Sequence, residues 1–137
     1  MSQACGRRRV FVVDDEEIIA STTAMILRHS GFDTTFFTLP LEALQAACQD
    51  APDLLITDVV MPRLSGIELA VQLRACCPDC KVLLFSGQAT TGNLIDAANG
   101  MGRDFELLAK PVPPAALLSK VKSLMEAIPL SDSLRAG

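Results

Sequence analysis

Five side chains in this sequence could form one site for a metal ion and a phosphoryl group: Asp14, Asp15, Asp58, Ser86 and Lys110. They lie at the ends of short, mostly apolar runs, which are typical of buried strands. Parallel strands place their carboxyl ends along one edge of a sheet, so these distant residues would meet there. Three carboxylates, one hydroxyl and one ammonium suit a hard divalent cation together with phosphate oxygens.

Strands and helices are expected to alternate along the chain. Apolar runs predict strands at residues 10–13, 54–57, 82–85 and 107–109, and a weaker, threonine-containing pattern predicts an edge strand at 32–37. Helical spacing predicts four helices with the following apolar faces: Ile18, Ile19, Thr22, Met25 and Ile26; Leu41, Leu44 and Cys48; Leu69, Leu73 and Cys76; and Leu117, Val121, Leu124 and Ile128. A further helix, rich in alanine, is expected at residues 90–99.

This alternation predicts a single α/β domain with a doubly wound parallel sheet and helices on both faces. Pro40 is expected to start the second helix, and Gly31 to end the first. In a five-stranded sheet of order 2-1-3-4-5, the winding reverses between the first and third strands. Those strands end in Asp14-Asp15 and in Asp58, so the predicted ligand edge coincides with the acidic residues.

The acidic residues favour a Mg²⁺ site, because three neighbouring carboxylates need a cation to remain ionised together. The alternative for Asp14 or Asp15 alone is a helix cap, and Ser86 could also be a cap. Lys110 precedes Pro111, and a cis bond between them would turn the ammonium over the strand ends; alternatively, Pro111 simply starts a helix.

Composition sets further bounds. The 137 residues fit one domain, and the net charge of −4 provides no general attraction for nucleic acid or anionic membrane. Residues 7–9 form the only basic cluster, and no apolar stretch approaches the roughly 20 residues that span a bilayer. Residues 10–13 are too short for a secretory signal, so we expect a cytoplasmic protein.

The cysteines are expected to be structural thiols. Five is an odd number, which argues against a disulfide framework. Cys77 and Cys80 form a C-x-x-C pattern that closes a helix, so a turn with small buried thiols is favoured over a redox pair or a zinc site. His29 lies near a helix end and is not expected to carry phosphate.

Four motifs together resemble the receiver domain of bacterial two-component response regulators, a flavodoxin-like or CheY-like fold. They are residues 12–16 with the acidic pair, Asp58-Val59-Val60-Met61-Pro62 with Gly66, Phe85-Ser86-Gly87, and Ala109-Lys110-Pro111. The resemblance covers residues 8–128, leaving residues 1–7 as an N-terminal extension and 129–137 as a tail or linker.

The resemblance implies that Asp58 accepts a phosphoryl group from a phosphohistidine of a histidine kinase or phosphotransfer protein. Ser86 and Lys110 would contact the phosphoryl oxygens. Asp15, Asp58 and the main-chain carbonyl of Val60 would bind Mg²⁺, and Asp14 would act mainly through water. Phosphorylation would then shift the face formed by the fourth helix, fifth strand and last helix, and so alter binding of a downstream protein.

Modulating positions depart from the family pattern. Leu107 stands where an aromatic residue is usual, so the aromatic readout of phosphorylation is in doubt. Gly87 stands where alanine is common, and Val60 and Gln88 are expected to influence phosphate lifetime. The chain would catalyse only its own phosphoryl transfer and dephosphorylation, as a monomer or weak dimer that binds neither nucleic acid nor membrane.

Two alternatives remain. A scaffold could keep the fold without phosphorylation, although the intact acidic, hydroxyl and lysine set speaks against this. A phosphohydrolase could use Asp58 as its nucleophile, but Val60 occupies the position where such enzymes place a second aspartate as general acid.

Overall fold

Five parallel strands form one sheet in the order β2-β1-β3-β4-β5. The computed structural model describes residues 8–61, 64–87, 105–110 and 112–127. The strands are β1 (Arg9–Val13), β2 (Asp33–Phe37), β3 (Leu54–Asp58), β4 (Lys81–Ser86) and β5 (Glu106–Ala109). The predicted strands and their order are confirmed, and β2 lies at an edge as expected.

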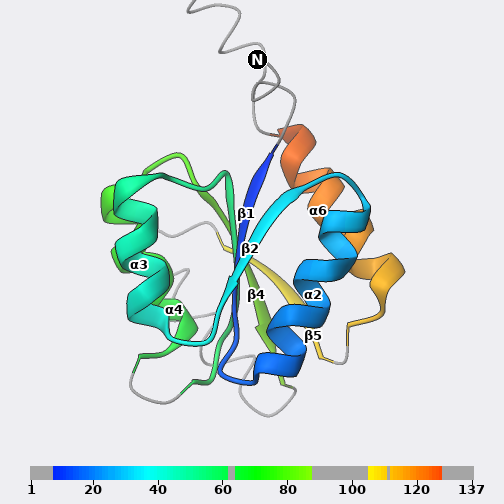
Figure 1. The fold of residues 1–137 in the computed structure, drawn as a ribbon, viewed down its shortest axis with the longest axis horizontal. Coiled ribbons are helices and arrows are strands. Elements are labelled where there is room, and N and C mark those ends of the chain that lie inside the picture. Colours follow the sequence, from blue (N-terminus) through cyan, green and yellow to red (C-terminus); the bar gives the residue numbers. More distant parts are fainter. Residues whose placement is uncertain (1–7, 62–63, 88–104, 111, 128–137) are drawn as a thin grey trace, which may run out of the picture.

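Helices cover both faces of this sheet, which gives the predicted three layers (Figure 1). α3 and α4 lie on one face, and α2 and α6 lie on the other. The helices are α2 (Glu17–His29), α3 (Pro40–Gln49), α4 (Gly66–Cys76) and α6 (Pro114–Ala127). The helix predicted at residues 90–99 falls outside the described residues, as does Ile128.

Local sequence explains where several helices begin and end. Pro40 lies at the start of α3, where its missing amide proton leaves no hydrogen bond unmade. Ser65 and Glu68 form a reciprocal capping box that starts α4. After α2 the chain turns at Gly31, whose φ of 95° favours glycine.

The core has one apolar layer on each side of the sheet. Successive residues of β1 alternate between them: Phe11 and Val13 pack in the layer under α3 and α4, while Val10 and Val12 pack in the layer under α2 and α6. The central strands therefore lack polar alternation because both faces are covered.

The predicted apolar face of α2 is wrong in part, since Ile19 and Ile26 are partly buried and Ile26 packs on the core layer under α2 and α6. Ile18 is 80% exposed and Met25 is 56% exposed. The buried face instead consists of smaller side chains together with one leucine: Ala20, Thr23, Ala24 and Leu27. These residues also have helical spacing.

The same kind of error occurs in α3. Leu41 is 60% exposed and Cys48 is exposed, whereas Pro40, Ala43 and Ala47 are buried. The predicted Leu44 is partly buried and packs on the core. Again the small residues face the sheet. The face predicted for α4 is correct at Leu69 and Leu73 but not at Cys76, which is exposed. In α6, the expected Leu117, Val121 and Leu124 are buried.

The cysteines follow the prediction only in part. Cys77 and Cys80 are buried free thiols in a turn after α4, in which the Cys80 amide donates to the Cys77 carbonyl oxygen at 3.1 Å. Cys48 and Cys76, however, are joined by a disulfide. The odd number of cysteines ruled out complete pairing, not a single bridge. In the described part of the chain, none of the helices has the length and apolarity needed to cross a bilayer.

Candidate functional site

Strand register brings the predicted site residues to one edge of the sheet. Val13 of β1 pairs with Thr57 of β3, so Asp14 and Asp58 follow side by side. Ser86 pairs with Ala109, and the Lys110 amide donates to the Ser86 carbonyl oxygen at 2.9 Å. The five predicted site residues therefore lie at the carboxyl ends of four adjacent strands.

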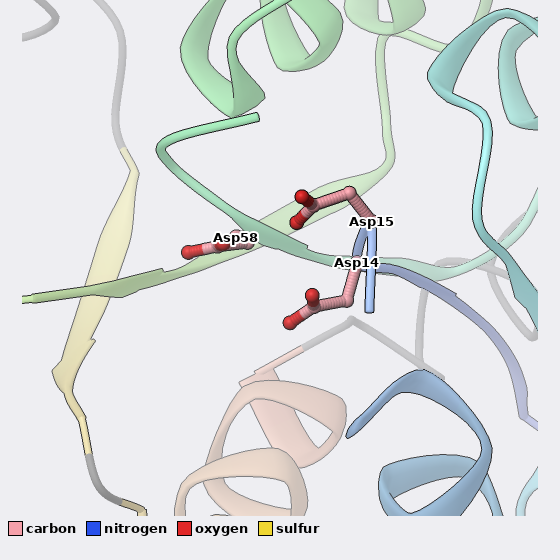
Figure 2. A group of neighbouring side chains, drawn as sticks. All are labelled: Asp14, Asp15 and Asp58. Atoms are coloured by element: carbon pink, nitrogen blue, oxygen red, sulfur yellow. The ribbon is translucent and has the colours of Figure 1, made fainter. Parts of the chain in front are cut away.

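The three carboxylates are close enough to share a cation. Figure 2 shows Asp14, Asp15 and Asp58 with their carboxyl groups pointing toward the same side. One oxygen from each lies within 4.8 Å of the others, and within the described residues no other group of three or more acidic, histidine or cysteine side chains converges in this way. Asp14 and Asp58 are buried, whereas Asp15 is exposed. Oxygen ligands at a partly open site fit Mg²⁺, which retains several waters.

Lys110 completes the charged cluster. Its Nζ lies 3.2 Å from Asp58 Oδ1 and 3.5 Å from Asp14 Oδ2. The other carboxylate oxygen of Asp14 accepts a hydrogen bond from the Glu16 amide at 2.9 Å. Asp14 is therefore held by the start of α2 and by Lys110, while Asp58 Oδ1 faces the ammonium.

Burial and charge act in opposite directions on these groups. Burial raises the pKa of Asp14, and the nearby Asp58 and Asp15 raise it further; the Glu16 amide and Lys110 lower it without cancelling the rise. Burial lowers the pKa of Lys110, but attraction to Asp14 and Asp58 outweighs that effect and raises it overall. Lys110 is thus an ammonium at neutral pH.

Ser86 and Gly87 form the next part of the edge. Ser86 is buried, and its hydroxyl donates to the Gly87 carbonyl oxygen at 3.0 Å. A Cβ at the exposed Gly87 would meet nothing within 4 Å, as expected for an opening above the site. Leu107 is partly buried and packs on the core layer under α3 and α4. Gln88 and Pro111 fall outside the described residues, so the cis bond remains a prediction.

The loop after Asp58 folds back against the strand. The Gly66 amide donates to the Val59 carbonyl oxygen at 2.8 Å, and a Cβ at Gly66 would overlap the main-chain carbonyl oxygen of Asp58. This close approach explains why the motif has glycine there. Val60 is 57% exposed on the same loop, and its role as a carbonyl ligand remains a prediction.

The sequence pattern did not single out Thr57. Its buried hydroxyl donates to the Asp58 carbonyl oxygen at 3.0 Å and lies 3.9 Å from the Met61 sulfur. Thr57 therefore links the end of β3 to the loop that follows Asp58. The available signal was a hydroxyl at the end of an otherwise apolar run, residues 54–57.

An open hollow of about 490 Å³ adjoins the charged cluster. It is lined by Ile19, Thr23, Phe85, Lys110 and Val112. Its wall is mostly apolar, and Lys110 links it to the carboxylates.

Comparison with known proteins agrees with this geometry. Residues 10–122 match the response regulator receiver domain. The chain belongs to this family. It is therefore a receiver domain of two-component signalling, in which the domain acts as a signalling protein and not as a conventional enzyme.

Two relatives and one solved structure illustrate the similarity. The chain is 33% identical over 124 residues to the transcriptional regulatory protein CreB of Escherichia coli, covering 89% of this chain and 52% of CreB. It is 29% identical over 124 residues to the response regulator MprA of Mycobacterium ulcerans, covering 90% and 53%. The chain thus spans about half the length of these relatives. The chemotaxis protein CheY4 of Vibrio cholerae shares the fold, with a TM-score of 0.78 and 24% identity over 87% of this chain and 99% of that one.

Proposed function

We propose that this receiver domain accepts a phosphoryl group on Asp58 from a phosphohistidine of a sensor histidine kinase or a histidine phosphotransfer protein. The observation that carries the proposal is the position of Asp58 Oδ1, 3.2 Å from Lys110 Nζ and within reach of two further carboxylates. This arrangement combines a nucleophile, a fixed positive charge and oxygen ligands for a cation.

The proposed transfer is an in-line displacement. A carboxylate oxygen of Asp58 attacks phosphorus, a P–O bond forms, and the P–N bond to the donor imidazole breaks, with its electron pair returning to nitrogen. Lys110 offsets negative charge on the transferring oxygens, and the Ser86 hydroxyl donates a hydrogen bond to one of them after turning away from the Gly87 carbonyl. Water later attacks the acyl phosphate, which releases inorganic phosphate and restores the Asp58 carboxylate.

Mg²⁺ is the cation that best fits this donor set. When bound, it supplies positive charge that offsets the charge of the phosphoryl oxygens. Asp15, Asp58 and the Val60 carbonyl oxygen would hold it directly, with Asp14 acting through a water molecule. The exposure of Asp15 leaves room for the remaining waters.

Phosphorylation would switch partner binding. It places about two negative charges where Asp58 carried one, which attracts Lys110 and Ser86 and moves the ends of β4 and β5. The surface that includes β5 and α6 would then present a different face to a downstream protein; the helix predicted at residues 90–99, which the family resemblance adds to this face, lies outside the described residues. We place the receiver at residues 8–128 and expect it to act in the cytoplasm as a monomer or weak dimer, without direct contact to nucleic acid.

Intact mass spectrometry tests this proposal directly. The protein is incubated with Mg²⁺ and a small acyl phosphate, and we expect one added phosphoryl group that hydroxylamine removes. Asp58→Asn should show no addition, because an amide cannot form the acyl phosphate. Asp79→Asn is the matched control, since Asp79 is exposed in the turn after α4.

The same experiment separates the alternatives. Rapid consumption of the acyl phosphate without a phosphorylated protein would indicate a phosphohydrolase. Absence of both consumption and addition would indicate a scaffold. Addition to Asp58→Asn at the normal level would place the acceptor elsewhere.

A further inference from the structure

Cys48 and Cys76 form an exposed pair on the helical layer made by α3 and α4. Each lies at the carboxyl end of its helix, and the two helices lie side by side on one face of the sheet (Figure 1). Their Cα atoms are 5.6 Å apart, and a disulfide joins them. This separation lies within the ordinary range for a disulfide bridge.

The neighbouring Cys77 and Cys80 are poorly suited to thiol–disulfide exchange. Cys77 and Cys80 are buried, and their thiols donate to the carbonyl oxygens of Ala47 at 3.4 Å and Lys81 at 3.2 Å. Burial raises the pKa of Cys77, and it raises that of Cys80 to about 12. Both therefore remain protonated thiols, whereas thiol exchange requires an accessible thiolate. Among the described cysteines, Cys48 and Cys76 are the exposed ones, so they are the pair that a soluble thiol or disulfide can reach.

We propose that Cys48 and Cys76 are a reversible oxidation site, which closes by exchange with a low-molecular-weight disulfide such as glutathione disulfide. One cysteine thiolate attacks a glutathione sulfur, forming a mixed disulfide and releasing one glutathione. The second cysteine thiolate attacks the protein sulfur of that mixed disulfide and releases the other glutathione. Two protein thiols are thereby oxidised to one disulfide, and glutathione disulfide is reduced to two thiols.

The bridge is separate from the phosphoryl site. Gly66 at the start of α4 abuts Asp58, whereas Cys76 is the last of the eleven residues of that helix. This length places Cys76 about 15 Å along the helix axis from the acidic edge. The inference therefore goes beyond the proposed function: oxidation would act on the α3–α4 surface and on stability, and not on the reacting atoms.

The bridge closes a loop with a sequence separation of 28 that contains β3. Closing such a loop reduces the conformational entropy of the unfolded chain and so stabilises the folded one. Oxidation is therefore expected to raise the melting temperature by roughly 10 °C. In a reducing compartment the bond would form only transiently, as is usual for redox-sensing cysteines. The site would thus report oxidant independently of phosphorylation.

The test titrates the full chain between reduced and oxidised glutathione, with native alkylation, peptide mapping by mass spectrometry and thermal unfolding. We expect protection of Cys48 and Cys76 together, a parallel rise in melting temperature, and reversal of both by dithiothreitol. Cys48→Ser should lose the bridge and the temperature shift. Cys77→Ala is the matched control and should keep both, because its thiol is buried and unbridged.

Several results would overturn the inference. These are a bridge mapped to Cys5 or Cys80, a redox-dependent temperature shift that persists in Cys48→Ser, or no shift in the native chain. Phosphorylation of Asp58 in Cys48→Ser serves as the fold control. Equal phosphorylation of Cys48→Ser and the native chain confirms that the two sites are independent, and a difference would contradict this.

Discussion

At the residue scale, Gly66 provides a direct test of the site geometry. A methyl group there would overlap the main-chain carbonyl of Asp58, and main-chain atoms cannot rotate away as a flexible side chain can. Gly66→Ala should therefore reduce the free energy of unfolding by about 2–4 kcal/mol and slow phosphorylation. Urea unfolding and the acyl-phosphate assay measure the two effects.

Gly87→Ala is the control for this substitution. Gly87 lies at the same edge of the sheet, but a Cβ there would meet nothing within 4 Å. The free energy of unfolding should change by less than about 0.5 kcal/mol. Equal losses in the two variants would show that the close approach at Gly66 is not the cause.

Lys110 is the second residue that tests the site. Its ammonium faces Asp14 and Asp58, so Lys110→Gln removes the positive charge while keeping most of the side-chain volume. The rate of phosphorylation by acyl phosphate should fall roughly 100-fold. Lys120→Gln removes an ion pair with Glu106 at the protein surface and should leave the rate unchanged. An unchanged rate in Lys110→Gln would contradict the proposed role.

At the scale of elements, two substitutions in α2 test which face of this helix packs on the sheet. Leu27 is fully buried, whereas Met25 is 56% exposed. Leu27→Ala should reduce the free energy of unfolding by about 2–5 kcal/mol. Met25→Ala should change it by less than about 0.5 kcal/mol. Chemical denaturation of the two variants is the measurement, and a larger loss from Met25→Ala would reverse the assignment of the face.

The strands could be predicted and two helix faces could not, for a physical reason. A strand covered on both sides needs a continuous apolar run, and residues 10–13, 54–56 and 82–85 provide one each. A helix presents only one face, and the buried faces of α2 and α3 consist mostly of alanine, threonine or proline, with Leu27 of α2 as the one large residue. Several large apolar residues of α2 and α3 therefore lie on the exposed side, and a prediction based on side-chain size chose the wrong face there.

At the scale of the whole molecule, the convergence of the candidate site residues could be predicted because strand order determines it. Parallel strands in this order must bring Asp14, Asp58 and Lys110 to one edge, whatever the details of side-chain packing. The bridge between Cys48 and Cys76 depends instead on how two neighbouring helices end on the same face. Local pattern contains no information on that distance, and the cysteine count was misleading.

Global stability should fall at high pH because of a buried thiol. Burial in the layer under α3 and α4 raises the pKa of Cys80 from 9.0 to about 12, so the unfolded chain loses this proton before the folded chain does. The pKa of this thiol is higher in the folded chain than in the unfolded one. Its contribution to stability is therefore fully present below the pKa of the unfolded chain and declines as pH rises from about 9 toward 12. At about pH 10 the loss from this group should be on the order of 1 kcal/mol relative to about pH 8. Cys80→Ala should show a smaller loss over this interval, because the variant has no thiol to ionise, and comparing the two slopes cancels the contributions of other groups. Equal slopes in the two proteins would mean that the Cys80 thiol ionises as readily in the folded chain as in the unfolded one.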